Sequence, residues 1–123
     1  MRIVNYIIRG GKMNVGFKRN GHTLIVNLSG ELDHHSAEKI REEIDLTMDK
    51  GFKNLIFNFS KVSFMDSSGI GVIIGRYKKV QRKGGITCIT CLSDKIKRIF
   101  DISGLFKIIP YYSSDEDALE KIV

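Results

Sequence analysis

The sequence lacks the features that mark several specialised classes of protein. Its 123 residues contain one proline and two cysteines. A single proline excludes collagen-like and proline-rich disordered chains, and two cysteines are too few for a fold held together by disulfides. Hydrophobic residues make up 42% of the chain and charged residues 28%, which is typical of a globular protein. The length predicts one domain with a core of its own.

The sequence also has no apolar run long enough to span a membrane, which takes about 20 residues in a helix. The apolar stretch within residues 1–12 is much shorter, and no signal-peptide cleavage site follows it. These residues hold three basic side chains and no acidic one. We expect residues 1–12 to be a flexible extension, or a segment added to a natural protein that starts at Met13, rather than a membrane anchor. The domain is then predicted to cover residues 13–123.

The net charge of +6 raises the question of an anionic partner. Without residues 1–12 the chain keeps 17 basic and 14 acidic residues, a net charge of +3. The remaining basic residues are scattered among the acidic ones, with no arginine-rich stretch and no pattern of a recognition helix. The charge therefore predicts neither direct nucleic-acid binding nor a membrane partner.

The two cysteines, Cys88 and Cys91, form a C-x-x-C pattern within a segment rich in β-branched residues. Such a segment predicts a strand, along which three residues span about 10 Å, too far for a disulfide. No second cysteine pair follows, and the three histidines lack zinc-ligand spacing. We expect buried, reduced thiols, no metal and no cofactor. Reduced thiols fit a cytoplasmic protein.

The periodicity of the apolar residues predicts strands that alternate with helices. The order of these predicted elements, β-β-α-β-α-β-α-β-α, indicates a single α/β domain in which packed helices cover a mixed sheet of about five strands. Ser36, Ser93 and Ser114 are predicted to cap helices. We expect strands at residues 15–19, 23–29, 53–60, 86–91 and 107–111, and helices at residues 37–50, 70–83, 94–102 and after 114.

The strongest local feature is Asp66-Ser67-Ser68-Gly69, at the predicted join between a central strand and a helix. Partners and ligands of open α/β sheets bind at the carboxyl ends of the strands. The free N–H groups and dipole of a helix N-terminus also favour an anion. A serine there can be a helix cap, a nucleophile or a phosphate acceptor, and position alone favours the cap.

Enzymatic use of these serines has little support in the sequence. A nucleophilic serine needs a base within hydrogen-bond reach, and His34 and His35 are the only candidates. The G-x-S-x-G motif of hydrolases is absent. The glycines at 69, 71 and 75 have the spacing G-x-G-x-x-x-G, which departs from the dinucleotide-binding pattern. We therefore expect no catalytic residue, and no enzyme.

The segment Gly30–Ser36 joins a strand to the first helix and contains Asp33. It is either a solvated loop capped by Ser36 or a loop at the same sheet edge as Ser67. The second interpretation requires the two strands to be parallel neighbours, in which case Asp33 borders the serine.

Three segments, residues 30–35, 64–78 and 97–109, carry a family signature. They closely resemble the anti-sigma factor antagonists of spore-forming bacteria, a branch of the STAS domain family. The resemblance runs from about Met13 to the C-terminus and leaves residues 1–12 outside. It implies a STAS fold and no catalytic nucleophile.

The resemblance also implies a switch controlled by phosphorylation. The unphosphorylated protein would bind an anti-sigma factor that is also a serine kinase with bound nucleotide, and so release the sporulation sigma factor F. The kinase would then phosphorylate Ser67, and a serine phosphatase would restore the serine. A general-stress sigma factor is the alternative target. Position nominates five partner-binding residues: Asp33, Asp66, Ser67, Ser68 and Gly69.

Overall fold

The computed structural model describes residues 3–7 and 13–122. These residues form a six-stranded sheet in which each strand lies beside its neighbour in the sequence, in the order β1-β2-β3-β4-β5-β6. The strands are β1 (Ile3–Ile7), β2 (Met13–Asn20), β3 (Thr23–Leu32), β4 (Asn54–Met65), β5 (Thr87–Thr90) and β6 (Tyr111–Tyr112). The helices are α1 (Ala37–Met48), α2 (Ser67–Arg82), α3 (Asp94–Ser103) and α4 (Asp115–Ile122), with one 3-10 turn, η1 (Leu105–Lys107).

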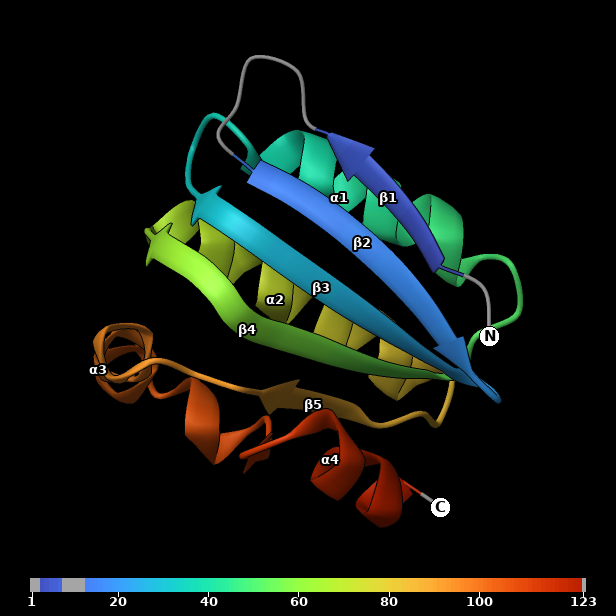
Figure 1. The fold of residues 1–123 in the computed structure, drawn as a ribbon. Helices are drawn as coiled ribbons and strands as arrows, with labels where there is room; N and C mark the ends of the chain where they lie inside the picture. Colours follow the sequence, from blue (N-terminus) through green and yellow to red (C-terminus); the bar gives the residue numbers. More distant parts are fainter. Residues whose placement is uncertain (1–2, 8–12, 123) are drawn as a thin grey trace.

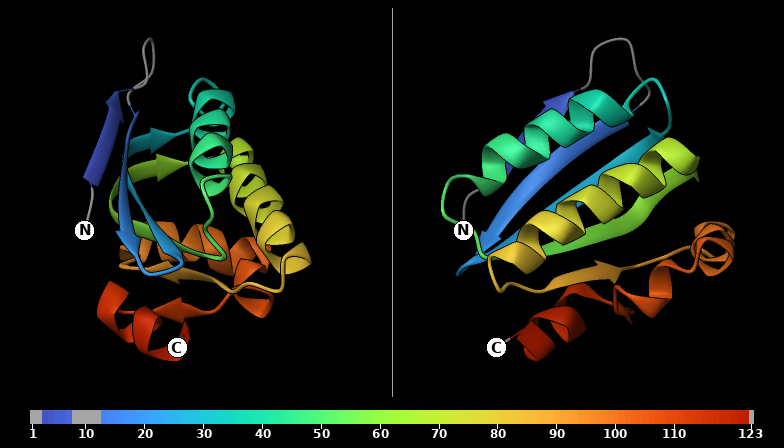
Figure 2. Two further views of the ribbon diagram at one scale, coloured as in Figure 1. Left: turned by 90° about the vertical axis from the view of Figure 1, so that its right-hand side faces the viewer. Right: turned by 180° about the vertical axis from the view of Figure 1, so that it is seen from behind.

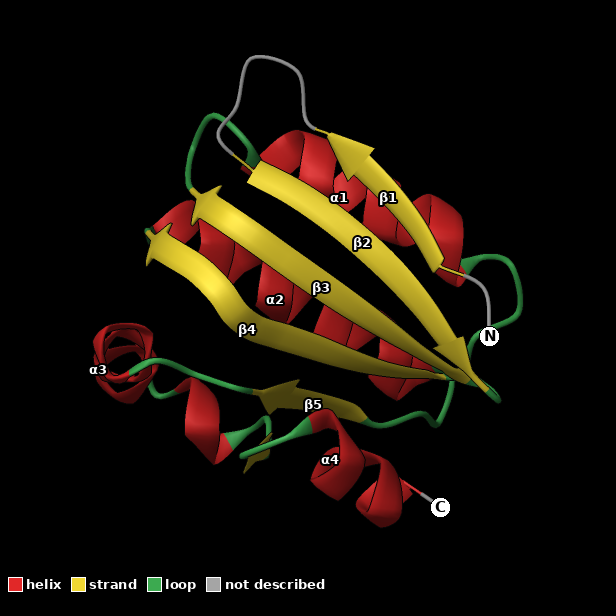
Figure 3. Cartoon of the chain, viewed as in Figure 1, coloured by secondary structure: helices red, strands yellow, loops and turns green. Residues whose placement is uncertain are grey.

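The sheet is mixed. β2 runs antiparallel to both of its neighbours, β1 and β3, and the strands from β3 to β6 run parallel to one another (Figures 1 and 3). The tight turn between β2 and β3 uses Gly21, whose φ of 59° is the left-handed region that favours glycine. Parallel strands need a crossover connection. α1 supplies the crossover from β3 to β4, and α2 supplies the one from β4 to β5.

Helices cover both faces of the sheet. α1 and α2 lie side by side on one face (Figure 2), where alternate strand residues such as Val26 and Phe57 are fully buried. The residues between them point to the other face, where Ile25, Ile56 and Cys88 pack with Ala118 of α4. Burial on both faces explains why the middle of β3 (Leu24–Val26) and the start of β4 (Leu55–Phe57) are continuously apolar.

The predicted fold class is confirmed: one α/β domain with four helices and a mixed sheet, in which the five predicted strands correspond to β2–β6. The last strand is displaced to Tyr111–Tyr112, because residues 105–107 turn into η1 instead of extending. Strands β3 and β4 continue beyond their predicted ends, so the two functional segments begin directly at the sheet edge.

The N-terminal segment differs from the flexible extension that we expected. Ile3–Ile7 form β1, which pairs antiparallel with β2. The N–H and C=O groups on the outer side of β2 offer an open edge to which a further strand can add. Residues 1–2 and 8–12 of the expected extension lie outside the described residues. Within the described ranges, no helix has the length and apolar character to cross a bilayer.

Both cysteines are free thiols. Cys88 is fully buried in β5, as expected, whereas Cys91 is only half-buried and follows the strand with a φ of 59°. Within residues 3–7 and 13–122, no cluster of three or more acidic, histidine or cysteine side chains is arranged to hold a metal ion.

The buried thiol should be chemically inert in the native state. Burial raises the pKa of Cys88 to about 11, so we expect a disulfide reagent at pH 8 to modify Cys91 much faster than Cys88. Because the native thiol holds its proton above the unfolded pKa of about 8.5, the free energy of unfolding should fall as pH rises from about 8.5 towards 11. Cys88→Ala removes that contribution. Equal modification rates for both thiols in the folded protein would contradict this expectation.

Candidate functional site

The candidate site is built where β4 ends and α2 begins. Asp66 has an extended backbone, with φ of −116° and ψ of −170°, and is the N-cap of α2. Its Oδ1 accepts hydrogen bonds from the backbone N–H of Ser68 at 2.9 Å and of Gly69 at 3.4 Å. The capping residue is therefore Asp66, and not a serine as position had suggested. Two N–H groups that we expected to be free for an anion are already occupied by its carboxylate.

The same carboxylate joins the two predicted segments. β3 and β4 are parallel neighbours, with Leu32 paired to Met65 at their carboxyl ends. Asp66 N–H donates to the carbonyl of Leu32 at 3.3 Å, and His34 N–H donates to Asp66 Oδ2 at 3.2 Å. The loop after β3 therefore lies at the same edge as Ser67, and it is fixed there by Asp66.

The loop from Asp33 to Ser36 is held by its own side chains. Asp33 Oδ1 accepts from the N–H of His35 at 2.9 Å and of Ser36 at 3.2 Å. The buried Ser36 hydroxyl donates to the carbonyl of Glu31 at 2.9 Å. Ser36 stands at the N-cap position of α1 but its side chain caps no helical N–H, because its backbone is already helical at φ −101° and ψ −19°. The predicted cap is thus a loop-fixing residue.

Gly69 lets α2 begin close beneath the strand ends. It is buried, and a Cβ at this position would lie 2.6 Å from Met65 Cγ and 2.7 Å from the carbonyl oxygen of Leu32. Both distances are shorter than a Cβ atom tolerates, and the Leu32 oxygen belongs to the backbone, so it cannot turn aside as a side chain can. Gly69 therefore positions the helix that carries Ser67, and it has no side chain to offer a partner.

The structure brings the nominated residues together but gives them different exposure. Ser67 is exposed and its hydroxyl makes no hydrogen bond to the described residues, while Asp33, Asp66 and Ser68 are half-buried. No hydrogen bond joins Ser67 to His34 or His35 within the described chain, so the arrangement lacks the base that a nucleophilic serine needs. What the site presents is an accessible hydroxyl beside a fixed carboxylate.

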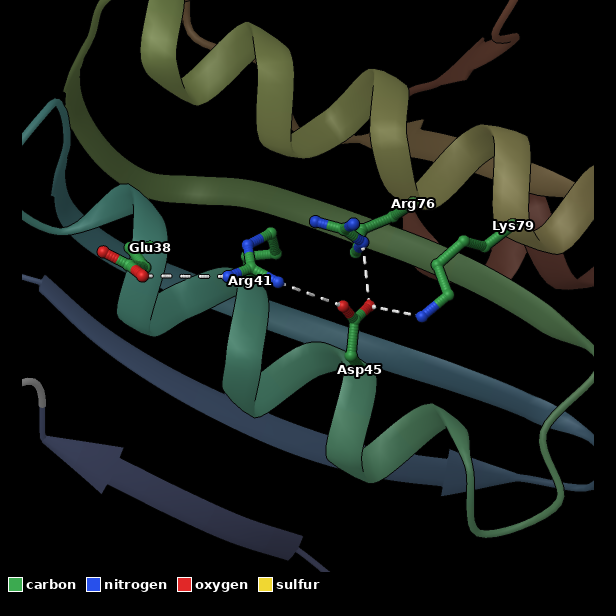
Figure 4. A network of polar contacts seen from close by, with 5 residues as sticks. All are labelled: Glu38, Arg41, Asp45, Arg76 and Lys79. Carbon is green, nitrogen blue, oxygen red and sulfur yellow. Dashed lines mark ion pairs between the residues drawn. The ribbon is translucent and has the colours of Figure 1, made fainter.

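A second group of charges lies beside this site, between α1 and α2 (Figure 4). Asp45 of α1 lies 2.9 Å from Arg76 Nε, 3.3 Å from Lys79 Nζ and 3.8 Å from Arg41 Nη1. Burial lowers the pKa of Arg76, the charge of Asp45 opposes that shift, and nearby Arg41 adds to it. The sequence interpretation missed this cluster. A signal existed, because Arg76 falls at helical spacing between the buried residues Val72 and Val80.

Removal of the Asp66 carboxylate should loosen both segments at once. We expect Asp66→Ala to lower the free energy of unfolding by about 1–3 kcal/mol, since it removes a helix cap and the bond to His34 N–H. Asn is about as good a cap as Asp, so Asp66→Asn should restore most of that loss. Chemical denaturation of the unmodified protein, Asp66→Ala and Asp66→Asn measures the three free energies of unfolding. Equal losses for Ala and Asn would show that capping is not what the side chain contributes.

Comparisons with known proteins identify relatives of this chain. The sequence profile of the STAS domain matches residues 14–118. The anti-sigma F factor antagonist of Paenibacillus polymyxa is 39% identical over 113 residues, covering 89% of this chain and 97% of that protein. The anti-sigma-B factor antagonist of Bacillus subtilis is 36% identical over 108 residues, covering 88% and 98%.

Solved structures show the same relationship. The anti-sigma factor antagonist SpoIIAA in its unphosphorylated form superposes with a TM-score of 0.76 at 31% identity, covering 88% of this chain and 95% of that one. The phosphorylated form of the Bacillus protein SpoIIAA gives a TM-score of 0.69 at 31% identity, covering 89% and 99%. Proteins of this kind are regulators and not enzymes. The chain therefore belongs to the STAS domain family, within its group of anti-sigma factor antagonists.

Proposed function

We propose that the protein is an antagonist switched off by phosphorylation of Ser67. Its unmodified form binds an anti-sigma factor that is also a serine kinase, with its bound nucleotide, and thereby frees a sigma factor. The kinase then transfers a phosphoryl group to Ser67, and the modified protein dissociates. A serine phosphatase returns Ser67 to the neutral hydroxyl. All of this takes place in the cytoplasm, without direct contact with nucleic acid or membrane.

The observation that carries the proposal is the position of Ser67. It is the first residue of α2, it is exposed, and its hydroxyl has no structural bond to lose. Ser68, the competing acceptor, is half-buried. A kinase can therefore reach Ser67 without unfolding the helix. The structure of a relative in a phosphorylated form, which has this fold, supports the idea that such a modification leaves the fold intact.

The charge at Ser67 explains how the switch would act. A phosphoryl group adds about −1.5 to −2 charges at pH 7. The helix dipole tolerates an anion, but the N–H groups of Ser68 and Gly69 already bind Asp66. The phosphate therefore lies beside a carboxylate, with two of the backbone donors at the helix start already engaged. An interface shaped for a hydroxyl would meet added bulk and a concentrated negative charge.

The cognate sigma factor is proposed to be the sporulation factor F. Residues 64–78 and the Glu31–His35 loop support this assignment through their resemblance to the sporulation branch. A general-stress factor is the second candidate, because an anti-sigma-B factor antagonist is 36% identical over 98% of its own length.

The proposal is tested by titration of the purified protein with each candidate anti-sigma kinase. Each titration is run once with ATP and once with a non-hydrolysable analogue. We expect tight binding with the analogue, and phosphorylation followed by dissociation with ATP, for the sporulation kinase. Stronger binding and faster phosphorylation by the general-stress kinase would assign the second target. Failure to bind either kinase would overturn the proposed function.

A further inference from the structure

A groove lies between α1 and α2, next to the candidate site. It has a volume of about 260 Å³ and is open to solvent. Ser68 at the start of α2 forms part of its wall, and Gly71 and Val72 continue that wall along the helix. A partner surface that covers Ser67 and continues along α2 therefore reaches this groove. Its other lining residues are Ala37, Glu38, Arg41 and Arg76.

The charges along the groove are unbalanced. Two cations, Arg41 and Arg76, and one carboxylate, Glu38, line the groove. Further along the two helices, Asp45 is shared by Arg41, Arg76 and Lys79. Glu38 lies 3.9 Å from Arg41, but its side chain is 82% exposed, so that contact is weak. The space between the two helices thus keeps a local surplus of positive charge.

Arg76 shows that this surplus is not fully satisfied. Its side chain is only 9% exposed. Although Nε lies near Asp45, neither Nε nor Nη1 completes a hydrogen bond within the described residues. The guanidinium projects between the helices on the side of Arg41 (Figure 4). A buried guanidinium with unused donors is costly unless an acceptor reaches it.

We propose that this groove receives an acidic side chain of the anti-sigma partner, bound between Arg41 and Arg76. This inference rests on the proposed function and adds a second recognition element to it. The planar guanidinium group matches a carboxylate, with which it can form two parallel hydrogen bonds. The exposed guanidinium of Arg41 would donate to the bound carboxylate, and the charge of Arg76 would attract it while Arg76 Nε stays paired with Asp45.

The shape of the groove favours a protein side chain over a small free anion. Because the groove is open to solvent, a free ion would remain largely hydrated and gain little. A carboxylate carried by a docked surface is delivered together with a wall that excludes water, and its ion pair with arginine is then stronger. The neighbouring Ser68 makes the groove continuous with the surface around Ser67.

The groove also gives the phosphorylation switch a second basis. An acidic partner side chain between Arg41 and Arg76 would lie in the same groove as Ser68, the residue next to Ser67. A phosphate on Ser67 would repel that side chain as well as Asp66. The two arginines would attract the acidic side chain of the partner, and a phosphate on Ser67 would repel that same side chain.

Binding of the anti-sigma factor to Arg41→Gln tests the inference. Arg41 is exposed, so the substitution should leave the fold intact, and Lys39→Gln on the same helix is a matched control with the same loss of charge outside the groove. We expect Arg41→Gln to raise the dissociation constant about tenfold and to reduce its salt dependence. Lys39→Gln should change it less than twofold. Glu38→Gln, which removes the exposed carboxylate of the groove, should tighten binding two- to threefold.

The outcomes separate this inference from the function on which it rests. If the unmodified protein binds the anti-sigma factor and Arg41→Gln binds as Lys39→Gln does, the groove proposal is wrong and the proposed function stands. If the unmodified protein does not bind, the proposed function fails. If inorganic sulfate raises the melting temperature of the unmodified protein but not of Arg41→Gln, while partner affinity is unchanged, the groove holds a small anion and the proposal is overturned.

Discussion

Replacement of Ser67 by aspartate should weaken binding to the anti-sigma kinase by about 100-fold or more, equivalent to about 3 kcal/mol. The exposed hydroxyl becomes a carboxylate beside Asp66, at the centre of the surface that the partner is proposed to cover. Stability should change little, because Ser67 is exposed and makes no hydrogen bond within the described chain. Calorimetric titration and thermal unfolding measure the two effects separately.

Ser67→Ala is the matched control for that variant. It removes the phosphate acceptor without adding charge, so it should bind the kinase within about threefold of the unmodified protein and never be phosphorylated. Ser68→Ala should still be phosphorylated. Tight binding by Ser67→Asp, in a protein that remains folded, would show that negative charge at this position is not the switch.

Among substitutions that add a single methyl group near the site, Gly69→Ala should lower the stability of the protein most. The added Cβ would lie 2.8 Å or less from three atoms of Leu32 and Met65, one of them a backbone carbonyl oxygen that cannot rotate away. We expect the free energy of unfolding to fall by about 1–3 kcal/mol, because α2 must move off the strand ends. Ser67 moves with the helix, so partner affinity should fall as well.

Gly71→Ala controls for the loss of a helical glycine. Gly71 lies two residues further along the same helix, and a Cβ there meets nothing within 4 Å. Alanine favours a helix over glycine by up to about 1 kcal/mol, so Gly71→Ala should be neutral or stabilising. Urea unfolding compares the two variants. If both behave alike, close packing is not the reason for glycine at position 69.

The sequence predicted the α/β order well because each element carries a clear apolar period. The alternation in residues 23–29 and the stripe on α2 follow from burial of one face or both. The segment β1 was missed since it is only five residues long and its residues were interpreted as an extension outside the domain, whereas they pair with β2, the next strand along the chain. The displaced β6 has two residues and almost no period to read.

The location of the site, where β4 ends and α2 begins, was predicted from the sequence, but the capping residue and the charges around Arg76 were not. Asp66, Ser67 and Ser68 are all good capping residues, so their types could not reveal that Asp66 is the cap. Only the extended backbone of Asp66 decides it, and that follows from how β4 ends against β3. The charges around Arg76 depend on how α1 packs on α2, which brings Asp45 within reach from another helix.

Phosphosite mapping and an affinity measurement on one sample decide whether phosphorylation of Ser67 switches the protein off. The protein is incubated with the cognate anti-sigma kinase and ATP, the modified form is isolated and mapped by mass spectrometry, and its dissociation constant is compared with that of unmodified protein. We predict a single phosphate on Ser67 and binding at least 100-fold weaker. A phosphate on Ser68 instead, or undiminished affinity with Ser67 fully phosphorylated, would show that Ser67 is not the switch.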